Sequence, residues 1–262
     1  MAIQSYGSIT SNSYISSIAP SNSLATGSRI NQAADDPAGL AVTTSLTTQV
    51  NAQDMAVQNA NNGIALLQTA DGGSQSITQS VLRMNELALQ AQNGTLSDQQ
   101  RAMLNVEFQQ NLENINTIAN NTSYNGINLL NADTSSVNIA LNDSNNALNL
   151  PNFTTDSLGL SGLDISNSAN ATLALQGLST ATEQLSNGRA QFGAQQNGLI
   201  SSVNNLNTQN INTLASRSTI SDADMARVVT EQTRQSILNE ASMAMQAQGN
   251  QSRASVLQLL GS

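Results

Sequence analysis

The sequence contains no cysteine, no histidine and no tryptophan, and aromatic residues make up only 2% of its 262 residues. Without cysteine the chain has no disulfide, no thiolate metal site and no thiol nucleophile. Without histidine it also lacks the commonest general base and metal ligand. We therefore expect a protein that has no metal site and no cofactor and that is not an enzyme.

Charged residues are also scarce, at 10% of the chain, and lysine is absent because all eight basic residues are arginine. The net charge of -9 argues against binding to nucleic acid, whose phosphates need a basic surface. No run of about 18 apolar residues occurs, so we expect no membrane insertion. Residues 1–30 lack the basic start and apolar stretch of a cleaved secretory signal, so export would have to use another route.

What the chain does have is a strict heptad pattern in its C-terminal half. A heptad repeat keeps one narrow seam facing a partner helix, because seven residues make almost two helical turns. The pattern predicts one long helix, from near Leu173 to about Arg217, that packs against other helices. Its seam consists of Leu178, Leu185, Phe192, Leu199 and Leu206, with Val203 as a second heptad position.

The N-terminal half also reads as helical. Apolar residues recur every three or four positions over residues 43–71, and this spacing is broken only by Gln53. We expect the helix to be interrupted at Gly72–Gly73, since glycine has poor helix propensity. Residues 1–20 have only a loose helical pattern, and Pro20 should end or kink any helix there.

Several polar residues have the spacing of helix ends. A second amphipathic run should close at Asn93–Gly94, a favourable C-terminal stop. Ser97 with Gln100 has the form of a capping box that opens a third helix, and Ser221 with Asp224 resembles another helix start. We interpret Asp35–Asp36 and Asp222 with Asp224 as helix caps or solvated loop residues, because nothing in the sequence builds a pocket around a catalytic carboxylate pair.

Residues 132–172 differ in character from the rest of the chain. The segments Val137–Leu141 and Ala147–Leu150 alternate apolar and polar residues with period two. This alternation predicts a short β-hairpin that turns around Asn145–Asn146. Pro151 and the glycines that follow predict an irregular region before the long C-terminal helix.

Taken in order, these motifs resemble bacterial flagellin over both terminal regions and thus over most of the chain. No single piece is specific, but their number and order are. The N-terminal pieces are LATGSRINQAADDPAGLA (24–41), QNANNGIALLQTADG (58–72), LRMNELALQAQNGT (82–95) and NNTSYNGINLLN (120–131). The C-terminal pieces are GRAQFGAQQNGL (188–199), ISDADMA (220–226) and the ending SVLQLLGS.

The resemblance implies a mainly α fold, in which the N- and C-terminal segments form a long antiparallel helical or coiled-coil rod with a small β-hairpin region in the middle. Only about 40 residues separate the two halves, so the outer variable domain of the family looks essentially missing. The implied parts are an N-terminal inner-tube segment (1–42), N-terminal rod helices (43–131), the short hairpin and irregular region (132–172), a C-terminal rod helix (173–219) and a C-terminal inner-tube helix (220–262).

The resemblance also implies the function: a subunit that polymerises into the flagellar filament, the propeller for swimming. Such a protein is extracellular and is exported without a cleaved signal peptide through the flagellar type III apparatus. Its expected partners are copies of itself, the export apparatus and an export chaperone, the filament cap and the hook-filament junction proteins. The inner-tube assembly contacts would include the apolar cluster Val256, Leu257, Leu259 and Leu260.

A second role, as the ligand of a Toll-like immune receptor, follows from the same resemblance. Arg83, Glu86 and Leu87 match a receptor-binding motif of many flagellins, and Glu107 matches a further contact. The plain alternative is an ordinary ion pair beside a packing leucine. Other functions left open are a hook-filament junction protein, a secreted coiled-coil ligand for a host receptor, and an enzyme or effector that uses the same export route.

Overall fold

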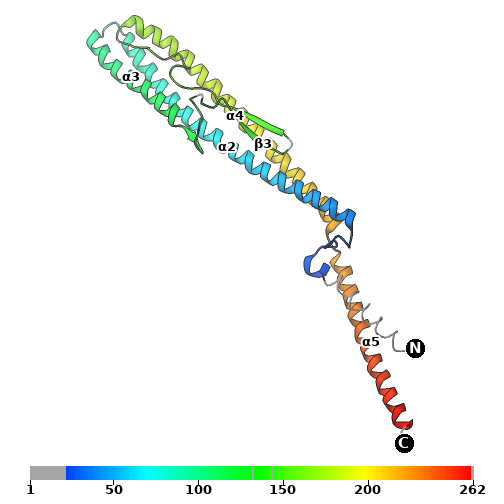
Figure 1. Ribbon diagram of the computed structural model, residues 1–262. Helices are drawn as coiled ribbons and strands as arrows, with labels where there is room; N and C mark the ends of the chain where they lie inside the picture. The colour runs from blue at the N-terminus through cyan, green and yellow to red at the C-terminus, as the bar shows by residue number, and fades with distance from the viewer. Residues whose placement is uncertain (1–21, 132, 143, 261–262) are drawn as a thin grey trace. The chain divides into compact units, whose positions relative to one another are not determined.

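The computed structural model describes residues 22–131, 133–142 and 144–260, which form four long helices and two short β-hairpins (Figure 1). This confirms the mainly α fold with a small β region. Residues 1–20, with the expected break at Pro20, lie outside the described residues. The helices are α2 (Pro37–Gln92), α3 (Asp98–Asn121), α4 (Ser168–Ser221) and α5 (Met225–Leu260), and the strands are β1 (Ser123–Tyr124), β2 (Ile127–Asn128), β3 (Ser136–Leu141) and β4 (Ser144–Asn149).

The chain divides into two compact units. The terminal unit comprises residues 1–50 and 211–262, and the central unit comprises residues 51–210. Helices α2 and α4 each contribute residues to both units. The central unit therefore contains most of α2 and α4, the whole of α3 and both hairpins.

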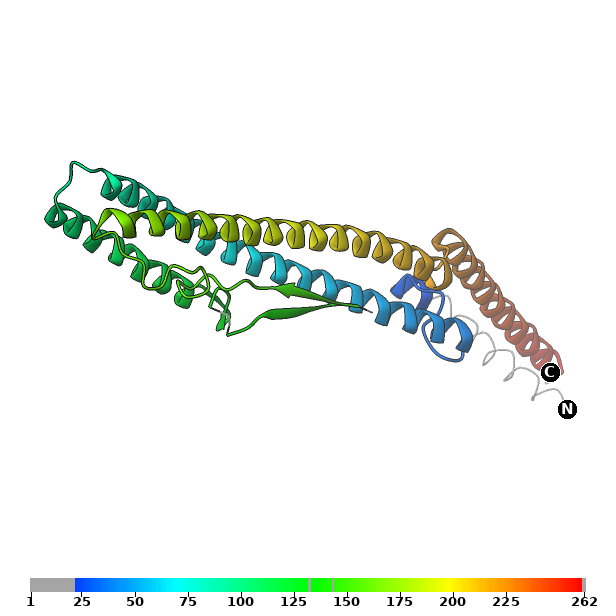
Figure 2. The same ribbon diagram turned by 90° about the horizontal axis from the view of Figure 1, so that it is seen from above.

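In the central unit, α2 and α4 lie side by side and run antiparallel (Figures 1 and 2). Arg189 of α4 pairs with Asp71 of α2, and Asn210 of α4 donates to Asp54 of α2, so residue numbers rise along one helix as they fall along the other. All five predicted main seam residues of α4 are buried, and Val203 is half-buried. The heptad pattern thus predicted the packed face of α4 correctly.

The matching face of α2 follows a 3-4 alternation without a break. Its members lie three and four residues apart and are buried: Gln53, Ala56, Ala60, Gly63, Leu67, Ala70, Ser74, Ile77, Val81, Met84, Ala88 and Ala91. Many are small, which lets α2 approach its neighbours closely while α4 supplies the larger leucine and phenylalanine side chains.

The predicted interruption at Gly72–Gly73 is wrong, because α2 continues through both glycines to Gln92. A β-carbon on Gly73 would lie 2.6 Å from Thr122 Oγ1 and 2.9 Å from Leu130 Cδ1. The glycine is there because the connection after α3 packs directly on the α2 backbone. Glycine costs a helix interior roughly 1 kcal/mol relative to alanine, and the seam on either side outweighs that cost.

The β3–β4 hairpin exists, but its turn is not at Asn145–Asn146. The strands pair from Ser136↔Asn149 to Leu141↔Ser144, so the chain reverses directly after Leu141. Asn142 has a φ of 54°, and asparagine tolerates this left-handed conformation better than most residues. With this register Ile139, Leu141 and Leu148 are buried.

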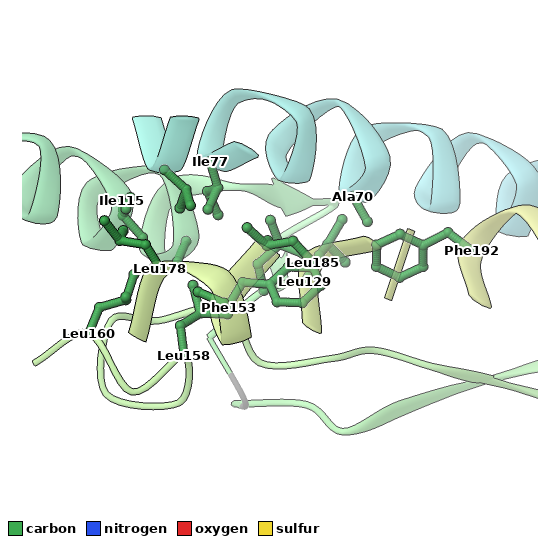
Figure 3. Packing of buried hydrophobic residues seen from close by; sticks show 14 of the residues in the cluster. Ala70, Ile77, Ile115, Leu129, Phe153, Leu158, Leu160, Leu178, Leu185 and Phe192 are labelled. Carbon is green, nitrogen blue, oxygen red and sulfur yellow. The ribbon is translucent and has the colours of Figure 1, made fainter. Parts of the chain in front are cut away.

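The chain between β4 and α4 contributes side chains to the core despite its irregular backbone. Phe153, Leu158 and Leu160 from this segment lie among core residues such as Leu178 and Leu185 of α4 (Figure 3). Phe153 meets Phe192 edge to face, with ring centroids 6.5 Å apart, a favoured aromatic geometry. This segment therefore covers the α4 face that a lone pair of helices would leave open.

In the terminal unit, the segment before α2 pairs with the chain between α4 and α5. Arg29 N donates to Ser221 O, and Ala223 N donates to Gly27 O. The predicted start at Ser221 is wrong, because Ser221 ends α4; Asp224 alone caps α5, accepting from Arg227 N at 3.1 Å.

The interpretation of Asp35 and Asp36 as cap and loop residues is confirmed. Asp36 caps α2 by accepting from Gly39 N. Asp35 accepts from Asn31 N and Gln32 N, and these backbone hydrogen bonds lower the pKa of the Asp35 carboxyl below its ordinary value.

Two glycines of α4 allow a matched test of the packing. A β-carbon on Gly188 would overlap the Phe153 ring and lie 3.2 Å from Pro151 Cγ, whereas one on Gly193 meets nothing within 4 Å. We expect Gly188→Ala to destabilise the protein by roughly 1–3 kcal/mol through overpacking. Gly193→Ala should stabilise it by roughly 0.5–1 kcal/mol. Urea unfolding followed by circular dichroism measures both, and equal effects of the two substitutions would contradict the packing described.

Candidate assembly and receptor surfaces

An exposed ion-pair cluster joins α2 to α3. Arg83 Nε donates to Glu107 Oε1 at 2.7 Å, and Arg83 Nη1 donates to Glu86 Oε2 at 2.9 Å. The hydrogen bond to Glu107, followed by that to Glu86, raises the pKa of the Arg83 guanidinium above its ordinary value. The structure thus brings together three of the four residues of the predicted receptor motif.

The fourth residue does not share this surface. Leu87 is only 1% exposed and belongs to the hydrophobic core, which agrees with the alternative of a packing leucine beside the ion pair. Leu87 is four positions after Arg83, but it lies on the core side of α2, next to the seam residues Met84 and Ala88. Because Leu87 is next to the seam position Ala88, the periodicity of the α2 seam could have predicted that Leu87 is buried.

A groove lined by polar side chains lies beside Arg83, between α2 and α3. Hydroxyl and amide groups dominate it, and Ile118 is its one strictly aliphatic side chain. Sequence analysis did not identify this groove, although polar residues recur at helical spacing on both helices. The residues that line it are Ser76, Gln79, Ser80, Arg83, Asn111, Asn114, Thr117 and Ile118.

The turn between α2 and α3 fixes how the two helices meet. The predicted capping box is confirmed: the Ser97 hydroxyl accepts from Gln100 N, and the Gln100 side chain accepts from Ser97 N. The predicted stop at Asn93–Gly94 is also confirmed, since α2 ends at Gln92.

Arg101 stabilises the same turn, and sequence analysis missed it. The side chain is buried, and its guanidinium donates to Ala91 O at 2.8 Å and to Asn93 O at 3.0 Å. It also donates to Asp98 Oδ1 at 3.0 Å. The last carbonyls of a helix lack intrahelical partners, and Arg101 supplies donors for two carbonyls at the end of α2.

In the terminal unit, α5 exposes many apolar side chains. Val229, Thr233, Ile237 and Leu238 line one groove on this helix. Met243 and Met245 are 61% and 73% exposed, which is unusual for two large apolar residues so close together. The predicted cluster Val256, Leu257, Leu259 and Leu260 falls in the last turns of α5, where only the backbone is described.

The part of the chain that the structure describes contains no group of three or more histidine, cysteine, aspartate or glutamate side chains placed to hold a metal ion. Within the same residues, no helix is long and apolar enough to cross a membrane.

Substitutions at the α2–α3 turn test the role of Arg101. We expect Arg101→Leu to destabilise the protein by roughly 1–3 kcal/mol, because the buried carbonyl of Ala91 and the partly buried carbonyl of Asn93 then lose their charged donor. Asp98→Ala should have little effect, since the Asp98 side chain is 89% exposed and exposed ion pairs contribute little. If thermal unfolding shows an equal loss for both variants, Arg101 acts through the ion pair and not through the carbonyls.

Comparison with known proteins gives one consistent result. The family profile of the bacterial flagellin N-terminal helical region matches residues 1–135, and that of the bacterial flagellin C-terminal helical region matches residues 175–260. A flagellin of Halalkalibacterium halodurans is 38% identical over 242 residues, which cover 90% of this chain and 89% of that protein.

Two solved structures show the same kind of fold. The crystal structure of Bacillus cereus flagellin is 32% identical, with a TM-score of 0.52 over 57% of this chain and 88% of that one. A structure described as a flagellar hook-associated protein from Vibrio parahaemolyticus has a TM-score of 0.62 over 72% of this chain and 100% of that one. Its identity is only 15%, so this second likeness concerns the fold alone.

Proposed function

Because the chain belongs to the bacterial flagellin family, we propose that it polymerises through its terminal unit. Members of this family are structural and not enzymatic, and this chain is a structural subunit of the flagellar filament. The observation that supports this proposal is the exposed apolar surface of α5. In the described part of the chain nothing covers Val229, Ile237 or Leu238. Apolar surface of this kind is stabilised when a neighbouring subunit excludes water from it.

Polymerisation through α5 agrees with the nearly balanced charge of the terminal unit. Six acidic residues face five arginines in residues 1–50 and 211–262, so its net charge is -1 of the -9 of the whole chain. The remaining -8 lies on residues 51–210. Subunits packed through their terminal units avoid the like-charge repulsion that the central units would create.

The central unit then forms the outside of a thin, smooth filament. The described residues between 133 and 167 form one hairpin and an irregular segment, which contribute Ile139, Phe153 and Leu160 to the core of the same chain. A region whose apolar side chains pack inward in this way leaves few residues to build a separate outer domain. The boundaries at 42, 131, 172 and 219 remain part of this proposal.

The wider setting follows from family membership. We propose that the subunit is extracellular. It reaches the filament tip unfolded through the flagellar type III apparatus, with the help of an export chaperone. Its other neighbours are the cap and the hook-filament junction proteins. The absence of cysteine suits passage between redox compartments. The earlier alternatives, a junction protein, an enzyme and a host-directed ligand without a filament role, are not favoured, since flagellin itself matches along 90% of the chain.

Truncation of α5 tests the assembly proposal. We expect a chain without residues 245–262 to remain soluble and to keep the helical content and unfolding transition of the central unit, but to form no filaments. Full-length Gly193→Ala protein, which changes only an open position on α4, should polymerise normally. Electron microscopy of both preparations after seeding decides the matter, and normal filaments from the truncated chain would refute the role given to α5.

A second function, recognition by a Toll-like receptor, is supported by the Arg83–Glu86–Glu107 cluster. Its three charged side chains are exposed and hold one another across two helices. A cluster of this kind presents a fixed pattern of charges to a partner without first having to be ordered. Leu87 would support this surface from the core side of α2.

Receptor activation by monomeric protein tests this function. We expect Arg83→Ala to reduce activation by about tenfold or more, as truncation of a central interface arginine commonly does. Arg234→Ala is the matched control, because Arg234 also pairs with a glutamate three residues away on an exposed helix face. Swimming should be unaffected by Arg83→Ala. If the two variants activate a reporter cell line as well as the unaltered protein does, the receptor proposal fails while the filament role stands.

A further inference from the structure

The fully buried side chain of Gln53, in the central unit, has polar atoms without partners among the described residues, and so does the half-buried Gln195 of α4, at its Oε1 alone. Gln53 is 0% exposed and occupies a seam position of α2, yet within the part of the chain that the structure describes neither Gln53 Oε1 nor Gln53 Nε2 has a hydrogen-bond partner. Two other buried polar residues of α2 are satisfied within the helix. Ser74 donates its hydroxyl to Ala70 O at 2.7 Å, and Thr43 donates to Leu40 O at 3.0 Å. Gln53 therefore stands apart from the other polar seam residues.

The amide of glutamine cannot be satisfied in the same way as these hydroxyls. Serine and threonine have a short side chain that reaches the carbonyl three or four residues back. Glutamine has two donors and a two-lone-pair acceptor on a longer stem, and all of them have left water at this position. Because unmatched burial of a polar group is unfavourable, opening of the helix pair here is favoured by rehydration of the amide.

The apolar packing around Gln53 is also thin. The seam residues of α2 beside Gln53 are Val50 on one side and the small Ala56 and Ala60 on the other, and the neighbouring main seam residue of α4 is Leu206. Val50 and Leu206 are each 7% exposed. Asn210 Nδ2 donates to Asp54 Oδ1 at 2.7 Å, so a polar contact on the surface joins the two helices at this level.

The opposite end of the central unit is packed more densely. There α2 contributes Ile77, Val81 and Met84, and α4 contributes Leu178 and Leu185, all of them 0–1% exposed. Helix α3 and the segment after β4 add further core residues to the same cluster. Local stability in a protein falls where apolar contacts are few and polar groups are unsatisfied.

We propose that Gln53 is a built-in opening point of the central unit, at which α2 and α4 separate first while the rest of the unit stays folded. The pair opens around residues 51–60 and 203–210, and the amide then regains its hydrogen bonds to water. If the chain is exported unfolded, as in the function proposed above, this is the end from which the central unit comes apart.

Hydrogen exchange followed by mass spectrometry on the full-length monomer tests the proposal. In the unaltered protein, amides of residues 51–60 and 203–210 should exchange at least about tenfold faster than those of residues 77–91 and 171–185. Gln53→Leu should slow exchange in the first two segments by about tenfold or more, since removing an unsatisfied buried group shifts the opening equilibrium by that order. Exchange in residues 77–91 should not change.

Two further variants keep the result interpretable. Gln53→Met preserves the unbranched shape of the side chain and should act like Gln53→Leu. Gln58→Leu adds the same apolar group at an exposed position five residues away and should leave exchange unchanged. Equal exchange in the unaltered protein and both Gln53 variants, or faster exchange in those variants, would overturn the proposal. Because the measurement uses monomers, it gives its answer whether or not the chain forms filaments.

Discussion

The contact between α2 and α4 is the interaction on which the central unit depends. One helix presents small residues such as Ala60, Ala70 and Ala88 at alternating spacings of three and four, and the other presents leucine and phenylalanine every seven residues. Small residues on one side let large ones on the other fill the space between two backbones. A chain with almost no aromatic residues can therefore still bury a continuous core, because the burial is spread along two long helices.

Everything else in the central unit is fitted to this pair. Helix α3 is held by its capping box and by Arg101, which donates to carbonyls at the end of α2. The connecting segments pack against the helices at two glycines. Thr122, at the end of α3, lies against Gly73 of α2, and Phe153, in the irregular segment, lies against Gly188 of α4. Each of these glycines permits a close approach of side chains to helix backbone. The middle of the chain therefore completes the core and does not form a domain of its own.

Periodicity predicted the helices and the α4 seam because burial on one face of a helix imposes a repeat that survives in the sequence. The capping box and the stop at Asn93–Gly94 could also be predicted, because each depends only on residues that are close together in the sequence. The errors have tertiary causes. Gly72–Gly73 was expected to break α2, but Gly73 serves a contact with residues 49 and 57 positions further on. The hairpin turn was misplaced because two asparagines in a strand resemble a turn until the register is known.

The candidate surfaces were predictable to a smaller extent. Motif resemblance identified Arg83, Glu86 and Glu107, which do meet, but it also placed Leu87 among them although the side chain is in the core. A motif records which residues matter and not whether they act by touching a partner or by supporting those that do. Arg101 and Gln53 could not be assigned roles from the sequence. The carbonyls to which Arg101 donates, and the lack of partners for the Gln53 amide, are defined only by the folded arrangement.

The central claim is that the apolar face of α5 is covered by other copies of the chain. Oxidative footprinting of methionine tests it directly, because Met243 and Met245 are on that helix and are exposed in the single chain. Monomers and assembled filaments are treated with the same dose of peroxide, and sulfoxide formation at each methionine is measured by mass spectrometry. We predict that Met243 and Met245 are oxidised at least about tenfold more slowly in the filament. Equal oxidation of these two residues in monomer and filament would contradict the account.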